Sequence, residues 1–180
     1  MTRAVFFDRD GIVNVRRPDD YVTSWEEFDF LPDVFTALPR VHAMGYRAII
    51  VSNQRGVALG RMTREDVDAV HAFMQQELSE TCGEAFDDIF VCPHDNSEHC
   101  ACRKPEPGMI LRAAEKWDID CAKSWMIGDA ESDVVAGRRA GCRTILVGAP
   151  RESVADVQCA SLNDAIGVIE AAMAQEESAE

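Results

Sequence analysis

Ala4-Val5-Phe6-Phe7-Asp8-Arg9-Asp10-Gly11 joins a short apolar run to a charged turn. An apolar run of this length predicts a strand that is buried on both faces. Similar runs predict further strands at residues 47–51, 88–91, 124–127 and 143–147. Amphipathic stretches between and after these runs predict helices at residues 32–44, 63–78, 107–117, 131–140 and 162–174. The alternation of strands and helices predicts an α/β fold with a Rossmann-like, doubly wound parallel sheet.

Two local signals refine the predicted helices. Pro39 lies inside the stretch 32–44, where its missing amide hydrogen is expected to kink or split the helix. Thr63 followed by Asp66 is typical of a helix N-terminus, because each side chain can accept a hydrogen bond from the other residue's backbone.

Length and composition limit the classes of protein that fit. The 180 residues, 47% of them hydrophobic, predict a single domain over 1–180 with a polar tail at 175–180 that we expect to be disordered. A net charge of −14 argues against nonspecific nucleic-acid binding. The apolar runs are strand-sized, and Asp8 interrupts the start before a signal peptide could form, so we expect no membrane association and a cytoplasmic location. The sequence carries no edge-strand or heptad signal, so we expect a monomer.

Polar residues follow the predicted strands at the edge where parallel sheets bind ligands. These residues lie in Asp8-Arg9-Asp10, in Ser52-Asn53-Gln54-Arg55, in Arg103-Lys104 and in Gly128-Asp129. A single Asp-x-Asp is common in turns, and the other segments are also ordinary turn sequences. Their combination at successive strand ends nevertheless indicates a catalytic site.

The residue types suit phosphoryl transfer. Asp8 can attack phosphorus and form an acyl phosphate. Asp8 and Asp129 offer the hard oxygen ligands that Mg²⁺ prefers, and the ion would offset their mutual repulsion. Asp10 can protonate the leaving oxygen and then activate water. Ser52 and Lys104 can hold the phosphoryl oxygens as their charge redistributes.

A cluster of cysteines and histidine interrupts the stretch before Arg103. Cys92, His94, Cys100 and Cys102 supply three thiolates and one imidazole, which form a complete tetrahedral set for Zn²⁺. A set without an open position predicts a structural ion that fixes the loop and orients Arg103 and Lys104. The alternative is a reduced, metal-free loop. His99 is a spare nitrogen beside Cys100 and is expected to be a bystander, with replacement of His94 as the alternative.

Taken in order, these motifs resemble the haloacid dehalogenase-like phosphatase superfamily, over about residues 5–147. Within it, the zinc loop that precedes Arg103-Lys104-Pro105 is similar to the histidinol-phosphatase and heptose-bisphosphate phosphatase group. The resemblance implies that Asp8 is the nucleophile, that Asp10 is the acid and base, and that Ser52 and Lys104 steady the phosphoryl group. It implies that Asp8, the Asp10 carbonyl and Asp129 bind magnesium.

The resemblance also implies residues that recognise substrate or support the site. Asn53, Gln54 and Arg103 are expected to bind substrate, and Asp133 is expected to position Lys104 or a metal-bound water. Two positions depart from the family pattern, and both bear on substrate choice. Arg55 stands where a small residue is usual, and Ala130 stands where some members carry a lysine.

Substrate choice follows from the short connections, which leave no room for a large cap domain. An open, capless or minimally capped site with Arg55, Arg61 or Arg103 at its rim could hold a second phosphate. The segments after Asn53 and Lys104 resemble the heptose enzymes, which suggests removal of the 7-phosphate from D-glycero-D-manno-heptose 1,7-bisphosphate, a step toward lipopolysaccharide or related nucleotide-heptoses. Histidinol phosphate is the alternative substrate, and an inactive, zinc-stapled binding module is the alternative class.

Overall fold

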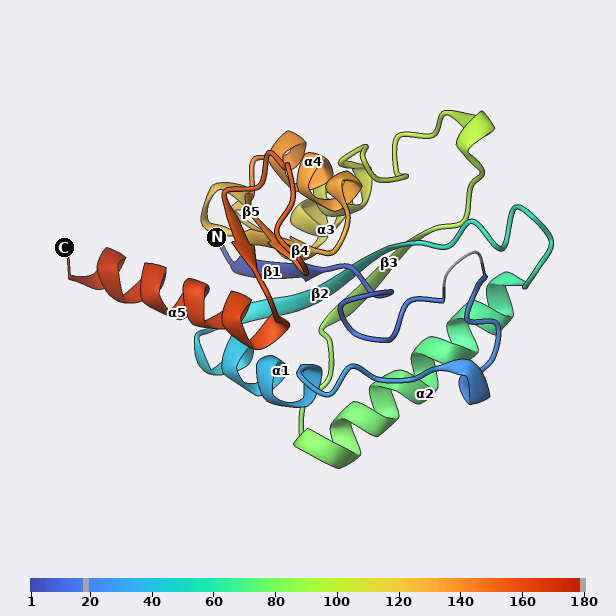
Figure 1. Cartoon of the computed structure of the whole chain (residues 1–180), viewed down its shortest axis with the longest axis horizontal. Helices are drawn as coiled ribbons and strands as arrows, with labels where there is room; N and C mark the ends of the chain where they lie inside the picture. The colour runs from blue at the N-terminus through green and yellow to red at the C-terminus, as the bar shows by residue number, and fades with distance from the viewer. Residues whose placement is uncertain (18–19, 179–180) are drawn as a thin grey trace.

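A six-stranded parallel sheet in the order β3-β2-β1-β4-β5-β6 forms the centre of the computed structural model, which describes residues 1–17 and 20–178 (Figure 1). The strands are β1 (Arg3–Phe7), β2 (Tyr46–Asn53), β3 (Asp88–Cys92), β4 (Trp125–Gly128), β5 (Arg143–Val147) and β6 (Val157–Cys159). All neighbouring strands run in the same direction. The predicted parallel sheet is confirmed, with β1 near its middle.

Helices cover both faces of the sheet. They are α1 (Val34–Ala43), α2 (Arg64–Cys82), α3 (Gly108–Trp117), α4 (Glu131–Ala140) and α5 (Leu162–Glu177). In Figure 1, α1, α2 and α5 lie on one side of the sheet, and α3 and α4 lie on the other. The connections after β1 and β2 lead to helices α1 and α2, so the expectation of a minimal cap is confirmed.

Alternating side chains of the strands divide the core into two layers. Val5 and Phe7 of β1 belong to the cluster under α1, α2 and α5, whereas Ala4 and Phe6 belong to the cluster under α3 and α4. All four side chains are buried, which explains why β1 is apolar on both faces.

Three features differ from the sequence prediction. The strand β6 was not predicted, because Val157–Cys159 is a short edge strand of partly exposed residues without an apolar run. Helix α5 continues to Glu177, three residues beyond the predicted helix end at residue 174; glutamine and glutamate favour helix there. Pro39 lies within α1, which continues to Ala43 without splitting. Residues 179–180 of the expected tail lie outside the described residues.

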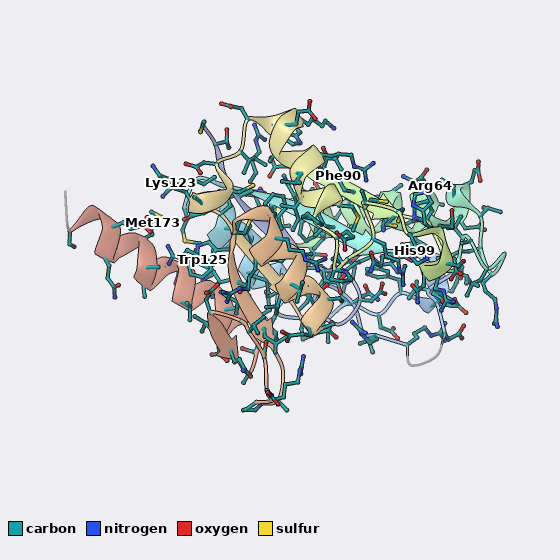
Figure 2. All side chains as sticks on the ribbon, turned by 90° about the horizontal axis from the view of Figure 1, so that it is seen from above. Arg64, Phe90, His99, Lys123, Trp125 and Met173 are labelled. Carbon is teal, nitrogen blue, oxygen red and sulfur yellow. The ribbon has the colours of Figure 1, made fainter. Side chains whose placement is uncertain are left out.

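The start of α2 has the predicted geometry. The Asp66 amide donates to Thr63 Oγ1 at 3.1 Å, and the Thr63 amide donates to Asp66 at 2.7 Å. Figure 2 shows His99 and Arg64 at the end of the molecule toward which the strands point, and Trp125 and Met173 at the opposite end. Among the described residues, no helix has both the length and the apolar character needed to cross a membrane.

Candidate active site

Two carboxylates meet at the carboxyl ends of β1 and β4. Phe7 pairs with Ile127 in the sheet, so the residues that follow the two strands lie side by side. Asp8 follows β1, Asp129 follows β4, and their oxygens lie within 4.8 Å of each other and of an Asp133 oxygen. The chain leaves β1 toward β2 on one side and returns at β4 on the other, which is the topological position where α/β sheets bind ligands.

Two glycines permit this close approach. A Cβ at Gly11 would lie 2.0 Å from Asp129 Oδ2, and its φ of +95° is one that other residues rarely adopt. A Cβ at Gly128 would lie 2.2 Å from the Cβ of Asp133. A side chain at either position would therefore push a carboxylate out of the site.

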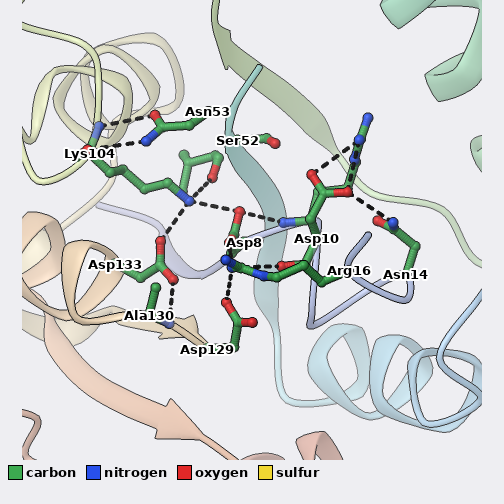
Figure 3. Close-up of polar contacts among 12 residues, drawn as sticks. Asp8, Asp10, Asn14, Arg16, Ser52, Asn53, Lys104, Asp129, Ala130 and Asp133 are labelled. Atoms are coloured by element: carbon green, nitrogen blue, oxygen red, sulfur yellow. Dashed lines mark hydrogen bonds and ion pairs between the residues drawn. The ribbon is translucent and has the colours of Figure 1, made fainter. Parts of the chain in front are cut away.

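Lys104 connects the loop after β3 to these carboxylates (Figure 3). Its Nζ lies 2.8 Å from Asp8 Oδ1 and 2.7 Å from Asp133 Oδ1, and it donates to the Val51 carbonyl at 2.8 Å. The Lys104 side chain is buried, and its three acceptors use all three ammonium hydrogens. The ammonium is thereby held against one oxygen of Asp8.

Burial changes the protonation of this pair. Desolvation and the nearby Asp133 raise the pKa of Asp8 to about 6, although Lys104 acts in the opposite direction. Desolvation would lower the pKa of Lys104, but Asp133 and Asp8 together raise it. Above a pH of about 6, the site therefore holds an ionised Asp8 beside a cationic lysine.

Asp10 is held in one orientation by four hydrogen bonds. The Arg9 guanidinium donates to both of its oxygens, at 3.0 and 3.1 Å. Asn14 donates at 2.9 Å and Gln54 at 3.0 Å. Burial favours the neutral acid, but the charge and hydrogen bonds of Arg9 outweigh it and lower the pKa of Asp10. These donors fix where Asp10 can exchange a proton.

A buried histidine of helix α2 contacts Arg9. His71 of α2 places Nε2 3.2 Å from Arg9 Nη1, and both side chains are buried. Burial, followed by the charge of Arg9, lowers the pKa of His71 to about 3. A neutral imidazole can accept the hydrogen bond from Arg9, which completes a chain from α2 to Asp10.

The predicted residues at the end of β2 point inward. The Ser52 hydroxyl is buried and accepts from Gln54 Nε2 at 2.7 Å. The Asn53 side chain accepts from the Lys104 amide and donates to the Lys104 carbonyl, both at 3.1 Å. Gln54 bridges Ser52 and Asp10. The side chains of Asn53 and Gln54 thus hold other residues of the site in place.

The two arginines expected to contact substrate differ in position. Arg55 forms an ion pair with Asp95 and does not line the cavity above Asp8. Arg103 lines that cavity and donates to the His94 carbonyl at 3.3 Å. Among the rim arginines expected to meet a second phosphate, the structure therefore brings Arg103 into the site and leaves Arg55 engaged elsewhere.

A cavity of about 470 Å³ opens above Asp8. Asp8, Asp10 and Lys104 form part of its wall, together with Arg16 and Tyr21 from the loop after β1. A second cavity of about 730 Å³ lies beside it and shares Asn53, Arg103, Lys104 and Ser132 in its wall. The two together offer space for a ligand larger than a single phosphate.

One further cation lies among the carboxylates. Arg16 Nη2 is 2.5 Å from Asp129 Oδ1, 3.2 Å from the Asp10 carbonyl oxygen and 3.8 Å from Asp8 Oδ2. These are the oxygens expected to bind magnesium. A positively charged nitrogen beside them indicates that this oxygen set attracts a cation.

The cysteine loop gathers its four predicted ligands. The Sγ atoms of Cys92, Cys100 and Cys102 are 3.3 to 3.6 Å apart. Nδ1 of His94 lies 3.4 Å from Cys92 and 3.2 Å from Cys102. Four ligands about 2.3 Å from one tetrahedral centre lie roughly 3.8 Å apart, so the cluster needs little change to hold a metal ion. His99 is exposed and is not part of this group.

Comparison with known proteins identifies the family. A family model described as HAD-hydrolase-like matches residues 101–168. A D-glycero-β-D-manno-heptose-1,7-bisphosphate 7-phosphatase from Helicobacter pylori is 39% identical over 145 residues, which cover 81% of this chain and 82% of that protein. The chain belongs to the haloacid dehalogenase-like phosphatase superfamily.

Two further relatives extend the comparison of this phosphatase. The D-glycero-α-D-manno-heptose-1,7-bisphosphate 7-phosphatase of Mycobacterium tuberculosis is 36% identical and covers 88% of this chain and 86% of its own. The crystal structure of D,D-heptose 1,7-bisphosphate phosphatase from B. bronchiseptica, complexed with magnesium and phosphate, has a TM-score of 0.82 and 31% identity. It covers 97% of this chain and 99% of its own.

Several residues of the phosphatase site were not singled out from the sequence. Arg9, Asn14, Arg16 and His71 all contact either Asp10 or a partner of it. Arg9 carried one signal, because a charged residue between two aspartates at a buried strand end needs a partner. Nothing in the local sequence marks His71, because its partner Arg9 lies 62 residues away in the chain.

Proposed function

We propose that this phosphatase removes the 7-phosphate of D-glycero-D-manno-heptose 1,7-bisphosphate through an aspartyl-phosphate on Asp8. The observation that carries the proposal is the buried Asp8–Lys104 pair beside a cavity large enough for a sugar phosphate. Relatives named for this activity, similar over most of their length, support the choice of substrate.

In the first step, an Asp8 oxygen bonds to phosphorus while the bond from phosphorus to the sugar oxygen breaks. Lys104 offsets the negative charge on the phosphoryl oxygens, and the Ser52 hydroxyl is proposed to donate a hydrogen bond to one of them. Asp10 must carry a proton at this step although its donors lower its pKa, and it gives that proton to the departing sugar oxygen, so the product leaves as an alcohol.

In the second step, water attacks phosphorus and the bond to Asp8 breaks. Asp10, now ionised, accepts a proton from that water, which releases inorganic phosphate and restores Asp8. Arg9, Asn14 and Gln54 hold the Asp10 carboxylate in one orientation for both transfers. Such fixed geometry lowers the entropic cost of each step.

We propose that Mg²⁺ is the catalytic cofactor, held by Asp8, the Asp10 carbonyl and Asp129. The position of Arg16 among these oxygens supports the fit, as does the magnesium named in the B. bronchiseptica structure. Bound there, the ion supplies positive charge to the phosphate and offsets the repulsion between carboxylates. Asp133, paired with Lys104, is proposed to position the lysine.

We propose that Cys92, His94, Cys100 and Cys102 hold a structural Zn²⁺. Arg103 and Lys104 follow Cys102 directly, so the ion would fix the loop that carries the substrate-binding arginine and the catalytic lysine. Cysteines that form no disulfide suit the reducing cytoplasm, which we propose as the location of the enzyme. We further propose that it is a monomeric, single-domain protein that binds no nucleic acid.

Arg103 is proposed to bind the phosphate that is not cleaved. It is a cation in the wall shared by both cavities. Asn53 and Gln54 are proposed to support the site through Lys104 and Asp10 as well as bordering the substrate. Arg55 would reach substrate only by leaving Asp95.

A substrate panel tests the function. Phosphate release is measured with the α and β anomers of heptose 1,7-bisphosphate, histidinol phosphate, fructose 1,6-bisphosphate and an aryl phosphate, with and without Mg²⁺. We expect the highest kcat/KM for a heptose bisphosphate, with ³¹P NMR showing loss of the 7-phosphate and no release by Asp8→Asn. Both anomers are included because the relatives carry both names.

Two outcomes would change the assignment. Faster cleavage of histidinol phosphate would replace the heptose substrate. Equal inactivity of the wild type and Asp8→Asn on every compound would favour a binding module without catalysis.

A further inference from the structure

The Arg16 guanidinium lies among the oxygens of the proposed magnesium site. A single nitrogen, Nη2, approaches Asp129 Oδ1 at 2.5 Å, the Asp10 carbonyl oxygen at 3.2 Å and Asp8 Oδ2 at 3.8 Å. Figure 3 shows Arg16 reaching across from the loop after β1 to Asp129, beside Asp8. The three oxygens belong to residues that follow two neighbouring strands, β1 and β4, and all three lie near the same nitrogen.

The arginine nitrogen and a magnesium ion cannot share this position. Mg²⁺ binds oxygen at about 2.0 to 2.1 Å and requires nearly octahedral geometry, which leaves no room for Nη2 among the same oxygens. Two positive charges at such a separation also repel strongly where the surroundings are partly buried. Binding of either cation therefore excludes the other.

Arg16 is well placed to leave. Its side chain is 48% exposed and lines the open cavity, so it can turn toward solvent without disturbing the core. By contrast, the other cation of the site, Lys104, is buried and has three acceptors. An incoming ion thus displaces Arg16 and leaves Lys104 in place.

We propose that Arg16 is a built-in competitor of magnesium, which fills the metal site in the metal-free enzyme and must leave before the ion binds. The inference rests on the metal site of the proposed function. It assigns to Arg16 control over metal affinity. The guanidinium offsets the charge of Asp129, and part of the charge of Asp8, when no ion is bound, and the affinity for Mg²⁺ is reduced by the free energy of that contact.

Metal titration of the full-length, zinc-loaded protein tests the proposal. Protein prepared in magnesium-free buffer is titrated with Mg²⁺ by calorimetry and with Mn²⁺ by EPR of the free ion, for the wild type and Arg16→Gln. Because a partly exposed charged contact is lost, we expect roughly fivefold tighter metal binding by Arg16→Gln. No substrate is present, so the result is independent of catalysis.

Arg17→Gln is the matched control. It removes the same charge from the neighbouring residue, whose partner is Glu27 at 2.9 Å, away from the metal oxygens. We expect its metal affinity to stay within about twofold of the wild type. An equal gain in both variants would show a general charge effect and would overturn direct competition by Arg16.

Thermal unfolding provides a second readout. Without Mg²⁺, Arg16→Gln leaves Asp129 without its counter-cation and Asp8 with Lys104 alone, so we expect a lower Tm than that of the wild type. Saturating Mg²⁺ should remove the difference. Unchanged or weaker metal binding by Arg16→Gln would overturn the inference alone. If no variant binds Mg²⁺, the inference and the proposed metal site both fail. If the metal affinities are as expected but the enzyme does not cleave heptose bisphosphate, only the proposed function fails.

Discussion

The Nζ of Lys104 lies 2.8 Å from Oδ1 of Asp8, and both side chains are buried. Removal of the lysine would leave Asp8 and Asp133 as neighbouring carboxylates without a cation between them. We expect Lys104→Met to lower the free energy of unfolding by about 3 to 5 kcal/mol and kcat by at least about 100-fold. Urea unfolding and phosphate release measure the two effects.

Lys116→Met is the control for this variant. Lys116 is exposed and pairs with Asp88 at 2.6 Å on the surface. Its loss should change stability by less than about 1 kcal/mol. Comparable losses of stability in the two variants would contradict the importance of the buried position.

Asp8→Asn is expected to separate stability from activity. Burial raises the pKa of Asp8 from 3.8 to about 6, so folding disfavours its ionised form at neutral pH. A neutral asparagine avoids this penalty, and we expect the free energy of unfolding in magnesium-free buffer at pH 7.5 to rise by up to about 3 kcal/mol, while phosphate release disappears.

Asp133→Asn provides the contrast. The Asp133 carboxylate pairs with Lys104 and also accepts from the Ala130 amide at the start of α4. Its replacement is expected to destabilise the fold. If Asp8→Asn lowers stability as much as Asp133→Asn does, the raised pKa of Asp8 does not describe the folded protein.

Loss of one cysteine ligand should remove the bound zinc. We expect one Zn²⁺ per chain in the wild type, measured by elemental analysis, and almost none in Cys100→Ser. The Tm should fall, and activity should decrease without reaching the level of Asp8→Asn, because Asn53 still holds the Lys104 backbone from β2. Cys159→Ser, a change on the edge strand β6, is the control and should keep its zinc. A wild type that contains no zinc after expression in its presence would refute the structural role of the ion.

His71 should contribute to the acid sensitivity of the fold. Its pKa is lowered from 6.5 to about 3, so below pH 6.5 the unfolded chain takes up a proton that the folded protein does not. The free energy of unfolding therefore decreases as the pH falls from 6.5 toward 3, by up to about 2 kcal/mol at pH 5. In His71→Gln, which keeps an acceptor for Arg9, this component should be absent.

Urea unfolding at pH 7 and pH 5 measures the contribution of His71 as the difference in lost stability between the wild type and His71→Gln. His42→Gln is the control, since His42 is less buried and lies beside Glu84 and Asp87. An identical loss of stability in the wild type and His71→Gln would show that His71 is not kept neutral by folding.

Much of this fold was predictable because a parallel sheet buries both faces of its strands. The apolar runs of β1 and β2 mark them directly, and the polar residues at their ends mark the site. The edge strand β6 lacks such a run. It has one neighbouring strand and is partly exposed to solvent, so Val157–Cys159 need not be apolar throughout.

The supporting contacts of the site depend on tertiary structure. His71 meets Arg9 only because α2 packs under the turn after β1, and no local pattern encodes that approach. Likewise, Arg55 looks like a free cation in the sequence, yet Asp95 pairs with it from the cysteine loop. Residue types and strand ends thus indicated the reacting groups, whereas the partners that orient them required the folded chain.

The position of β1 between β2 and β4 has a consequence for synthesis. During translation β1 can pair with β2 early, but its other edge stays unpaired until β4 has emerged from the ribosome. Until then Asp8 is not yet grouped with Asp129 and Asp133. The unpaired edge of β1 is meanwhile open to pairing with other proteins. The order of strands in this sheet thereby makes the grouping of Asp8 with Asp129 and Asp133 a late event in the synthesis of the chain.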